Sequence, residues 1–147
     1  MKNLCLILSL SLILSTESEN RLVFIYNAKS GIINGIFDYV HKFVSPSTYS
    51  CNLCSLTYDN LGKKNEWANY LNNLSVDVLF AYKDNINNQK NNFLVNYLDS
   101  IEPPCVFIIK DSIQIEIINS IEMNKLNNLN DLKVLLNNRL IEFNYIN

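Results

Sequence analysis

Four short apolar runs, rich in β-branched and aromatic residues, constrain the fold of this chain more than any other feature. Each run has the length and composition of a buried strand. The last two are separated only by Asp111 and Ser112, so we expect them to pair as an antiparallel hairpin. The four predicted strands are residues 21–26, 76–82, 105–110 and 113–118.

Between these strands, apolar residues recur at helical spacing. Steps of three and four residues from Ile33 to Val44 predict an amphipathic helix. A second helical pattern runs from Pro46 to Leu74 and is interrupted near Gly62. A third helix is expected around residues 93–98. Strands that alternate with helices favour parallel pairing of the first two strands.

The chain ends with leucines at helical spacing from Leu129 to Leu140, and Asn128 or Asn130 is a suitable cap for this helix. No linker or repeat divides the sequence after residue 21. The sequence therefore predicts a single α/β domain over residues 21–147, with a mixed sheet of about four strands.

The first twenty residues have the pattern of an export signal. Lys2 supplies a positive charge, Leu4–Leu14 is apolar except for two serines, and Ser15–Asn20 is polar. This order is typical of a secretory signal, and the apolar run is short for a membrane-spanning helix. We expect residues 1–20 to be a signal peptide or an uncleaved N-terminal anchor. The protein would then be periplasmic or secreted, and would touch a membrane only through an uncleaved segment.

The charge pattern argues against nucleic acid as a partner. The net charge is −2 with a pI near 5.3, whereas a nucleic-acid-binding domain usually carries a clustered basic surface. The longest basic run, Lys63–Lys64, is interpreted as a solvated helix face. No nucleotide is expected either, because Asn27–Gly31 lacks the spacing of a phosphate-binding loop. The sequence predicts no cofactor.

The element order resembles that of the thioredoxin fold, most specifically at Ile101–Lys110. Thioredoxins reach their third strand through a cis-proline, followed by an apolar strand, a charge, a turn and another strand. The resemblance implies a three-layer sandwich. It also implies that Pro104 corresponds to the cis-proline that flanks the active cysteines and holds the backbone of a client protein.

The position of the cysteines departs from that pattern. Thioredoxins carry Cys-x-x-Cys at the turn after the first strand, and here the turn Ala28–Ile32 has no cysteine. Cys51 and Cys54 come later, on an additional helix. The surrounding segment, Ser45–Thr57, is similar to a motif of a small bacterial family of uncharacterised proteins.

Cys51 and Cys54 are the candidate catalytic residues. Their spacing suits a disulfide at a helix N-terminus, where the helix dipole stabilises a thiolate and makes the first cysteine nucleophilic. Such a pair could exchange disulfides with a client in an oxidising compartment. The alternatives are a structural disulfide, two buried thiols or part of a metal site.

Metal binding is the weakest of these alternatives, because a closed site needs four ligands. The other candidate ligands are His41, Cys105 and the acidic residues, and there is no second Cys-x-x-Cys. We therefore predict no metal. His41 is interpreted as a surface or core-edge residue rather than a catalytic base. Cys105 is interpreted as a buried strand residue rather than a third reactive thiol.

Two functional hypotheses follow. The first is an exported thioredoxin-like protein that performs thiol–disulfide exchange through Cys51 and Cys54. The second is a non-catalytic module of the same fold, with a structural cysteine pair, that binds another exported protein. A straight helix from Ile32 to Val44 rises roughly 20 Å. Unless residues 45–50 turn back, the pair is carried towards the far end of the sheet, and we therefore expect Cys51 to lie more than about 10 Å from Pro104.

Overall fold

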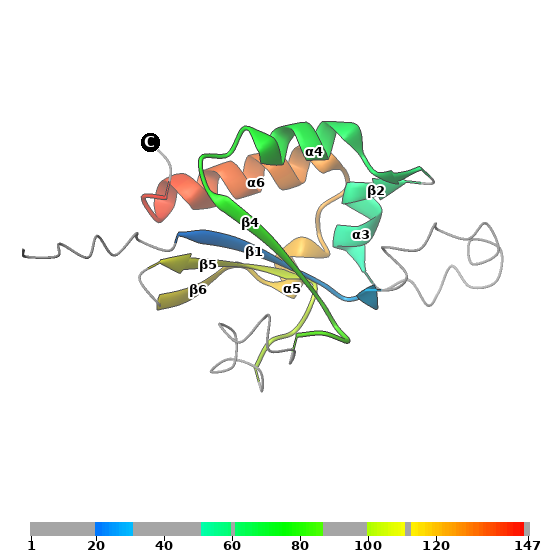
Figure 1. Cartoon of the computed structure of the whole chain (residues 1–147), viewed down its shortest axis with the longest axis horizontal. Coiled ribbons are helices and arrows are strands. Elements are labelled where there is room, and N and C mark those ends of the chain that lie inside the picture. Colours follow the sequence, from blue (N-terminus) through cyan, green and yellow to red (C-terminus); the bar gives the residue numbers. More distant parts are fainter. Residues whose placement is uncertain (1–19, 31–50, 60, 87–99, 111–112, 146–147) are drawn as a thin grey trace, which may run out of the picture.

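A mixed four-stranded sheet forms the centre of the domain (Figure 1). The computed structural model describes residues 20–30, 51–59, 61–86, 100–110 and 113–145. The sheet has the order β4-β1-β5-β6; β1 pairs in parallel with β4, whereas β1–β5 and β5–β6 are antiparallel. The predicted strands and hairpin are confirmed, with bounds β1 (Arg21–Tyr26), β4 (Asp77–Tyr82), β5 (Cys105–Lys110) and β6 (Ile113–Ile118).

The composition of β1 explains its central place. Residues Leu22 to Tyr26 have no exposed surface, and such a continuous apolar run is stable only when both faces of the strand are covered. Leu22, Phe24 and Tyr26 face the larger of two hydrophobic clusters, whereas Val23 and Ile25 face the smaller one. β1 therefore joins the two halves of the core.

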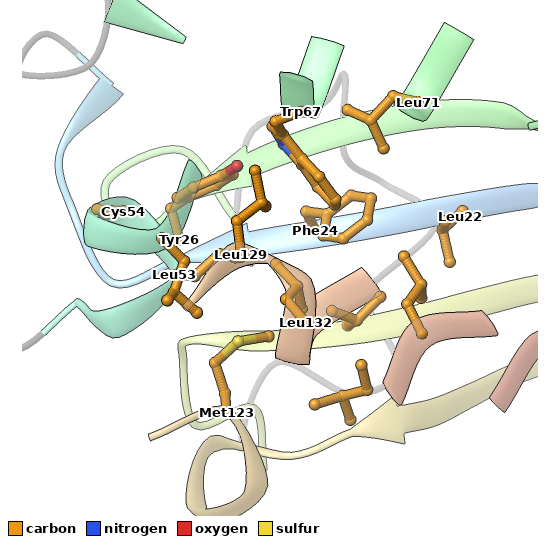
Figure 2. Close-up of a cluster of buried hydrophobic side chains, with 14 of the residues drawn as sticks. Leu22, Phe24, Tyr26, Leu53, Cys54, Trp67, Leu71, Met123, Leu129 and Leu132 are labelled. Carbon is orange, nitrogen blue, oxygen red and sulfur yellow. The ribbon is translucent and has the colours of Figure 1, made fainter. Parts of the chain in front are cut away.

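Helices cover the face of the sheet that carries the larger cluster (Figure 1). They are α3 (Asn52–Thr57), α4 (Asn65–Asn72), α5 (Ser120–Met123) and α6 (Leu129–Glu142). Figure 2 shows their apolar side chains converging on β1. The contributors include Leu53 and Cys54 from α3, Trp67 and Leu71 from α4, Met123 from α5, and Leu129 and Leu132 from α6.

The last helix follows the prediction closely. Its buried stripe consists of Leu129, Leu132, Leu136 and Leu140, which are spaced so as to lie on one face. Of the two proposed caps, Asn128 is the one used, and its side chain accepts a hydrogen bond from the backbone N–H of Asp131. That bond satisfies one of the amide groups that the first helical turn leaves without an intrahelical partner.

The opposite face of the sheet carries the smaller cluster. Val23 and Ile25 of β1 lie there with Ala81 and with alternate residues of β5, and Leu79, Ile86 and Ile101 pack against them. The helices expected at 33–44 and 93–98 fall outside the described residues, as does the segment 1–19. A third layer and the N-terminal signal therefore stay predictions. Among the described helices, none has both the length and the apolar character that crossing a bilayer requires.

Two local features add detail to the sequence prediction. The predicted interruption of the helical pattern near Gly62 is confirmed, and it consists of a small hairpin of β2 (Tyr58–Asp59) and β3 (Gly62–Lys63). Gly62 has a φ of 113°, a conformation that side-chain-bearing residues rarely adopt, so the hairpin depends on glycine there. In β6 the register with β5 shifts near Val106, and the resulting bulge lets the successive residues Ile117 and Ile118 join the same cluster.

Candidate functional site

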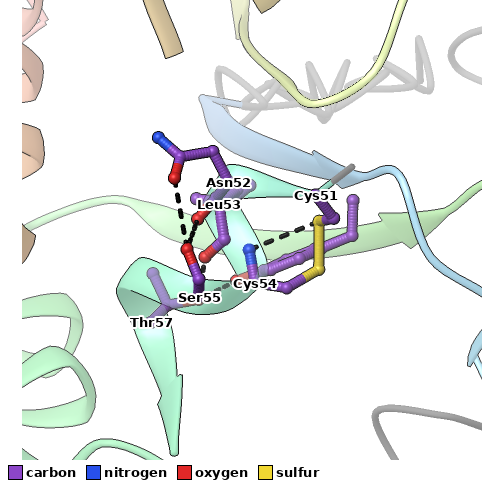
Figure 3. The surroundings of a disulfide bond; sticks show 7 residues. Cys51, Asn52, Leu53, Cys54, Ser55 and Thr57 are labelled. Carbon is purple, nitrogen blue, oxygen red and sulfur yellow. Dashed lines mark hydrogen bonds between the residues drawn. A yellow bond between two sulfur atoms is a disulfide. The ribbon is translucent and has the colours of Figure 1, made fainter. Parts of the chain in front are cut away.

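Cys51 and Cys54 are joined by a disulfide at the start of α3 (Figure 3). Their Cα atoms are 5.3 Å apart. Cys51 is the residue that caps the helix, and its sulfur lies 3.3 Å from the backbone nitrogen of Cys54, which donates to it. The structure therefore brings the two predicted site residues together, in the oxidised form that their spacing suits.

The disulfide is buried. Cys51 is 2% exposed and Cys54 is 1% exposed, and both belong to the larger hydrophobic cluster together with Leu53 and Leu56. Disulfide exchange requires a thiolate to reach one sulfur along the axis of the S–S bond. With so little exposed surface on either cysteine, the disulfide is not accessible to a client thiolate in this conformation.

Polar contacts hold α3 firmly in the core. The Asn52 side chain donates to the backbone carbonyls of Met123 and Leu126 at 2.8 and 2.9 Å. At the other end of the helix, the Thr57 hydroxyl donates to the Leu53 carbonyl at 2.6 Å. The Tyr26 hydroxyl is then left to donate to Thr57 Oγ1, at 3.2 Å. The helix that carries the disulfide is thus tied to β1, to the end of α5 and to the segment that follows α5.

Lys63 and Lys64, which were interpreted as a solvated helix face, have different surroundings in the structure. Lys64 Nζ donates to the carbonyls of Ser55 and Leu56, at 3.2 and 2.8 Å, where a cation complements the C-terminal end of α3. Lys63 lies in β3, with its Nζ 4.0 Å from the centre of the Phe80 ring. The interpretation as a helix face is wrong because the interruption near Gly62 includes both lysines: Lys63 lies in β3, and Lys64 is the N-cap residue of α4.

The position of α3 relative to the sheet also differs from the expectation that the cysteine pair lies at the far end. The Tyr26–Thr57 contact places α3 at the end of the sheet where β1 ends. β5 begins at the same end, because Cys105 pairs with Ile25. The disulfide is therefore not carried to the far end, as a straight preceding helix would imply. The segment that determines this path, residues 31–50, lies outside the described residues.

Pro104 precedes β5 at this end of the sheet. It is buried, and its peptide bond with Pro103 is cis, as the thioredoxin resemblance implied. Its role in binding a client stays a prediction, as does its separation of more than about 10 Å from Cys51, which rested on helix rise alone.

Cys105 has the properties of a core residue. It has no exposed surface, and burial, together with the nearby Glu116 carboxylate, raises the pKa of its thiol well above the ordinary range. A thiol with a raised pKa is a poor nucleophile at neutral pH because little thiolate forms. His41 lies outside the described residues. Within the described ranges, no group of three His, Cys, Asp or Glu side chains is arranged to hold a metal ion.

The turn after β1, where thioredoxins carry their cysteines, holds a polar contact instead. The backbone N–H and the hydroxyl of Ser30 donate to the Asp84 carboxylate at 2.8 and 3.0 Å. The backbone hydrogen bond from Ser30 is the main cause of the lowered pKa of Asp84. This contact joins the chain that leaves β1 to the chain that leaves β4, and it brings no nucleophile to the turn.

A groove between α4 and β4 is a second candidate site, and the sequence analysis did not identify it. Its volume is about 370 Å³. One wall is α4, and the other is the edge of the sheet at β4. The sequence feature that could have revealed this groove is Gly62. Its position shortly after Asp59 indicates a turn, and a turn there would place Lys63 outside a helix. The lining residues are Lys63, Ala68, Leu71, Asn72, Leu74, Val76, Asp77, Val78 and Phe80.

Comparisons with known proteins add no relative: no family model matches the chain, and no curated protein or solved structure matches it. The resemblance of Ser45–Thr57 to a bacterial family therefore stays a prediction. Functional inference depends on the geometry of the disulfide and of the groove.

Proposed function

We propose that this protein is a thioredoxin-like binding module in which the Cys51–Cys54 disulfide is structural. The observation that carries this proposal is the burial of the two cysteines, at 2% and 1% exposure. A disulfide that exchanges with clients needs an accessible sulfur. A disulfide that stabilises a short helix does not.

The pairing pattern of the sheet supports the thioredoxin-like part of the proposal. A parallel pair, β1 and β4, is followed by the antiparallel strands β5 and β6 and by the covering helix α6. This is the arrangement that the resemblance around Pro104 implied. The turn after β1 has no cysteine, which supports a module without the usual redox centre.

An exported location is part of the same proposal. Disulfides persist in oxidising compartments and are rare in the reducing cytosol. The Cys51–Cys54 bond and the signal-like residues 1–20 both favour a periplasmic or secreted protein. Its partner would then be another exported protein.

The proposal is tested by the rate at which dithiothreitol reduces the disulfide in the native protein. New thiols are trapped with iodoacetamide and mapped by mass spectrometry. We expect reduction to be at least about a hundredfold slower in the native protein than in urea. The reason is that a local opening that costs about 3 kcal/mol exposes the bond only about one percent of the time.

The Cys5→Ala/Cys105→Ala variant is the matched control, because every trapped thiol in it then comes from the pair. Its reduction rate should equal that of the wild type. Native reduction as fast as reduction in urea would overturn the structural role of the disulfide.

Removal of the disulfide provides a second readout. Closing a loop of four residues stabilises a protein by about 2 kcal/mol in the chain-entropy treatment. The double variant Cys51→Ser/Cys54→Ser should therefore melt about 6 °C lower than the wild type while keeping its circular dichroism spectrum. An unchanged melting temperature would contradict a stabilising role.

Thiol–disulfide exchange is a second candidate, and the position of α3 favours it. The disulfide and Pro104 both lie at the end of the sheet where β1 ends and β5 begins. In such a reaction a client thiolate would attack the Cys51 sulfur of the disulfide and release the Cys54 thiolate. A second client thiolate would then attack the client sulfur of the mixed disulfide, releasing the Cys51 thiolate and leaving the client oxidised and the pair reduced.

This candidate predicts that Cys51 in the reduced native protein is alkylated much faster than Cys105. Cys105 is a suitable internal reference because it has no exposed surface. Equal and slow alkylation of the two residues would exclude exchange as the function.

A further inference from the structure

The edge of the sheet beside the groove has an open side. Of the described strands, β4 is paired only with β1, so its other edge presents backbone N–H and C=O groups without strand partners. Such an edge is a template for the addition of another strand. Only Ala81 is fully buried in β4, while Asp77 is exposed and the remaining residues are partly exposed.

The groove lies directly over this open strand. Val78 and Phe80 of β4 belong to the groove lining, and they lie two residues apart, so both point to the helical face of the sheet. A strand added along β4 would place every second side chain over that same face. The apolar residues Ala68, Leu71 and Leu74 on the other wall would then contact those side chains.

Lys63 and Asp77 are the two charged residues of the groove lining. The Lys63 ammonium group sits over the Phe80 ring at 4.0 Å, and no carboxylate in the described part of the chain forms an ion pair with it. Burial lowers its pKa from the ordinary value of 10.5, because a partly desolvated ammonium is less stable than one in water. A carboxylate from a ligand would offset that cost.

We propose that the edge of β4 and the groove beside it bind an extended peptide segment of a partner protein, with an acidic side chain placed against Lys63. Backbone hydrogen bonds to β4 would supply affinity, and the groove would select apolar side chains flanking the acidic one. This proposal rests on the proposed binding function and names the chemistry of its partner.

A second copy of this chain fits the groove less well. Symmetric pairing of β4 with itself would bring a second Lys63 to the same groove. Two partly buried cations close together repel each other, whereas an acidic peptide removes the unpaired charge. The Lys63 ammonium, which forms no ion pair with Asp77 or with any other carboxylate in the described part of the chain, therefore favours an acidic peptide over self-association.

The test uses the whole chain and two labelled hexapeptides that differ in one residue. The acidic probe is Val-Thr-Glu-Thr-Val-Thr, which places Glu and the two valines on one face of the strand, and its neutral match is Val-Thr-Gln-Thr-Val-Thr. Fluorescence anisotropy should show that the acidic probe binds roughly fivefold more tightly than the neutral one, the size expected for a partly exposed ion pair. In the Lys63→Gln variant this difference should disappear.

Two further variants separate the effect of the Lys63 charge from the effect of the shape of the groove. Lys125 is exposed and lies outside the groove, so Lys125→Gln removes the same charge and should leave the preference for the acidic probe unchanged. Asn72 is exposed at the end of α4 and lines the groove. A tryptophan in its place should fill the groove without disturbing the core, and it should weaken the binding of both probes by at least about tenfold.

Amide hydrogen exchange identifies the mode of binding. The acidic probe should protect backbone amides of β4, because an added strand pairs with them. Binding without new protection in β4, or binding that is the same in the Lys63→Gln and Asn72→Trp variants, would overturn the proposal. So would the absence of binding by both probes, or self-association of the wild-type protein that protects the backbone amides of β4.

The failure of this proposal can be told apart from the failure of the proposed function. The titration is repeated with the Cys51→Ser/Cys54→Ser variant, and equal affinity is expected because no groove residue lies in α3. Fast native reduction would contradict the structural disulfide and leave the titration intact. Absence of binding would contradict the groove and leave the disulfide result intact.

Discussion

The side-chain amide of Asn52 satisfies two backbone carbonyls, those of Met123 and Leu126, that lie more than seventy residues away in the chain. These partners explain why α3 stays in place although it is only six residues long. An isolated helix of that length is not stable in water, so its stability must come from tertiary contacts.

Replacing Asn52 with alanine should therefore destabilise the protein by about 2 kcal/mol, since each hydrogen bond contributes about 1 kcal/mol and both carbonyls would lose their partner. The free energy of unfolding in urea is the measurement. Asn69→Ala, at an exposed position of α4, is the matched control and should change it by less than about 0.5 kcal/mol. Equal effects of the two substitutions would show that Asn52 does not anchor α3.

For single residues, the sequence predicts contacts between residues that are close in the chain. It does not predict contacts between residues that are distant in the chain. The spacing of Cys51 and Cys54 suits a disulfide, and the position of Asn128 suits a helix cap; both features are present. The role of Asn52 could not be predicted, because asparagine is frequent throughout this sequence and nothing local distinguishes this one. The burial of the cysteines likewise depends on the packing of the whole core.

Among the elements, α6 provides the clearest link between sequence and stability. Asn128 caps it, Asp131 lies in its first turn and Arg139 in its last, so charges at both ends complement the helix dipole. Arg139 also forms ion pairs with Glu122 and Glu142, at 2.6 and 2.8 Å. The Glu122 contact joins α6 to α5.

Asn128→Ala should lower the free energy of unfolding by about 1 kcal/mol, because the Asp131 amide loses its acceptor. Asn128→Ser keeps an acceptor oxygen and should restore most of that loss. The neighbouring substitution Asn127→Ala serves as the control, since the Asn127 contact with Asp131 uses only its backbone N–H. Urea unfolding measures all three variants, and equal losses for Asn128→Ala and Asn128→Ser would contradict the capping role.

The strands were predictable as elements because each is a compact apolar run, and their bounds agree within one residue with the sequence ranges. The β2–β3 hairpin was missed for a physical reason. Its strands have two residues each, too few for an alternating pattern to emerge from a sequence whose flanking segments are helical. That omission also concealed the groove, because Lys63 reaches Phe80 only from the hairpin.

For the whole molecule, the mixed sheet follows from the order of strands and helices, but the path of the chain across it does not. The expectation that α3 lies at the far end assumed one straight helix after β1. The observed contact between Tyr26 and Thr57 reverses that placement. The contacts of Thr57 with Tyr26 and of Asn52 with Met123 and Leu126 hold α3 at this end, and no periodicity in the sequence encodes them.

These aromatic residues make the stability of the molecule sensitive to alkaline pH. Burial raises the pKa of Tyr70 to about 12, and it also raises the pKa values of Tyr26, Tyr58 and Tyr82 above the ordinary 10.0. A phenol with a raised pKa keeps its proton in the folded state after the unfolded chain has released it. Its contribution to stability is therefore complete below pH 10.0 and is lost as the pH rises through the folded pKa.

The free energy of unfolding should consequently fall steeply above about pH 10, with Tyr26 alone contributing up to about 1.4 kcal/mol per pH unit because it has no exposed surface. Urea unfolding from about pH 8 to about pH 11, with tyrosinate absorbance recorded in parallel, provides the measurement. Tyr70→Phe removes one titrating group and its hydrogen bond to Asn137. This variant should be less stable than the wild type at neutral pH, by about 1 kcal/mol, yet lose stability less steeply above pH 10.0. A stability that stays constant across this range would show that the tyrosines ionise in the folded protein as freely as in the unfolded chain, and the packing of the aromatic residues around β1 would have to be looser than the structure indicates.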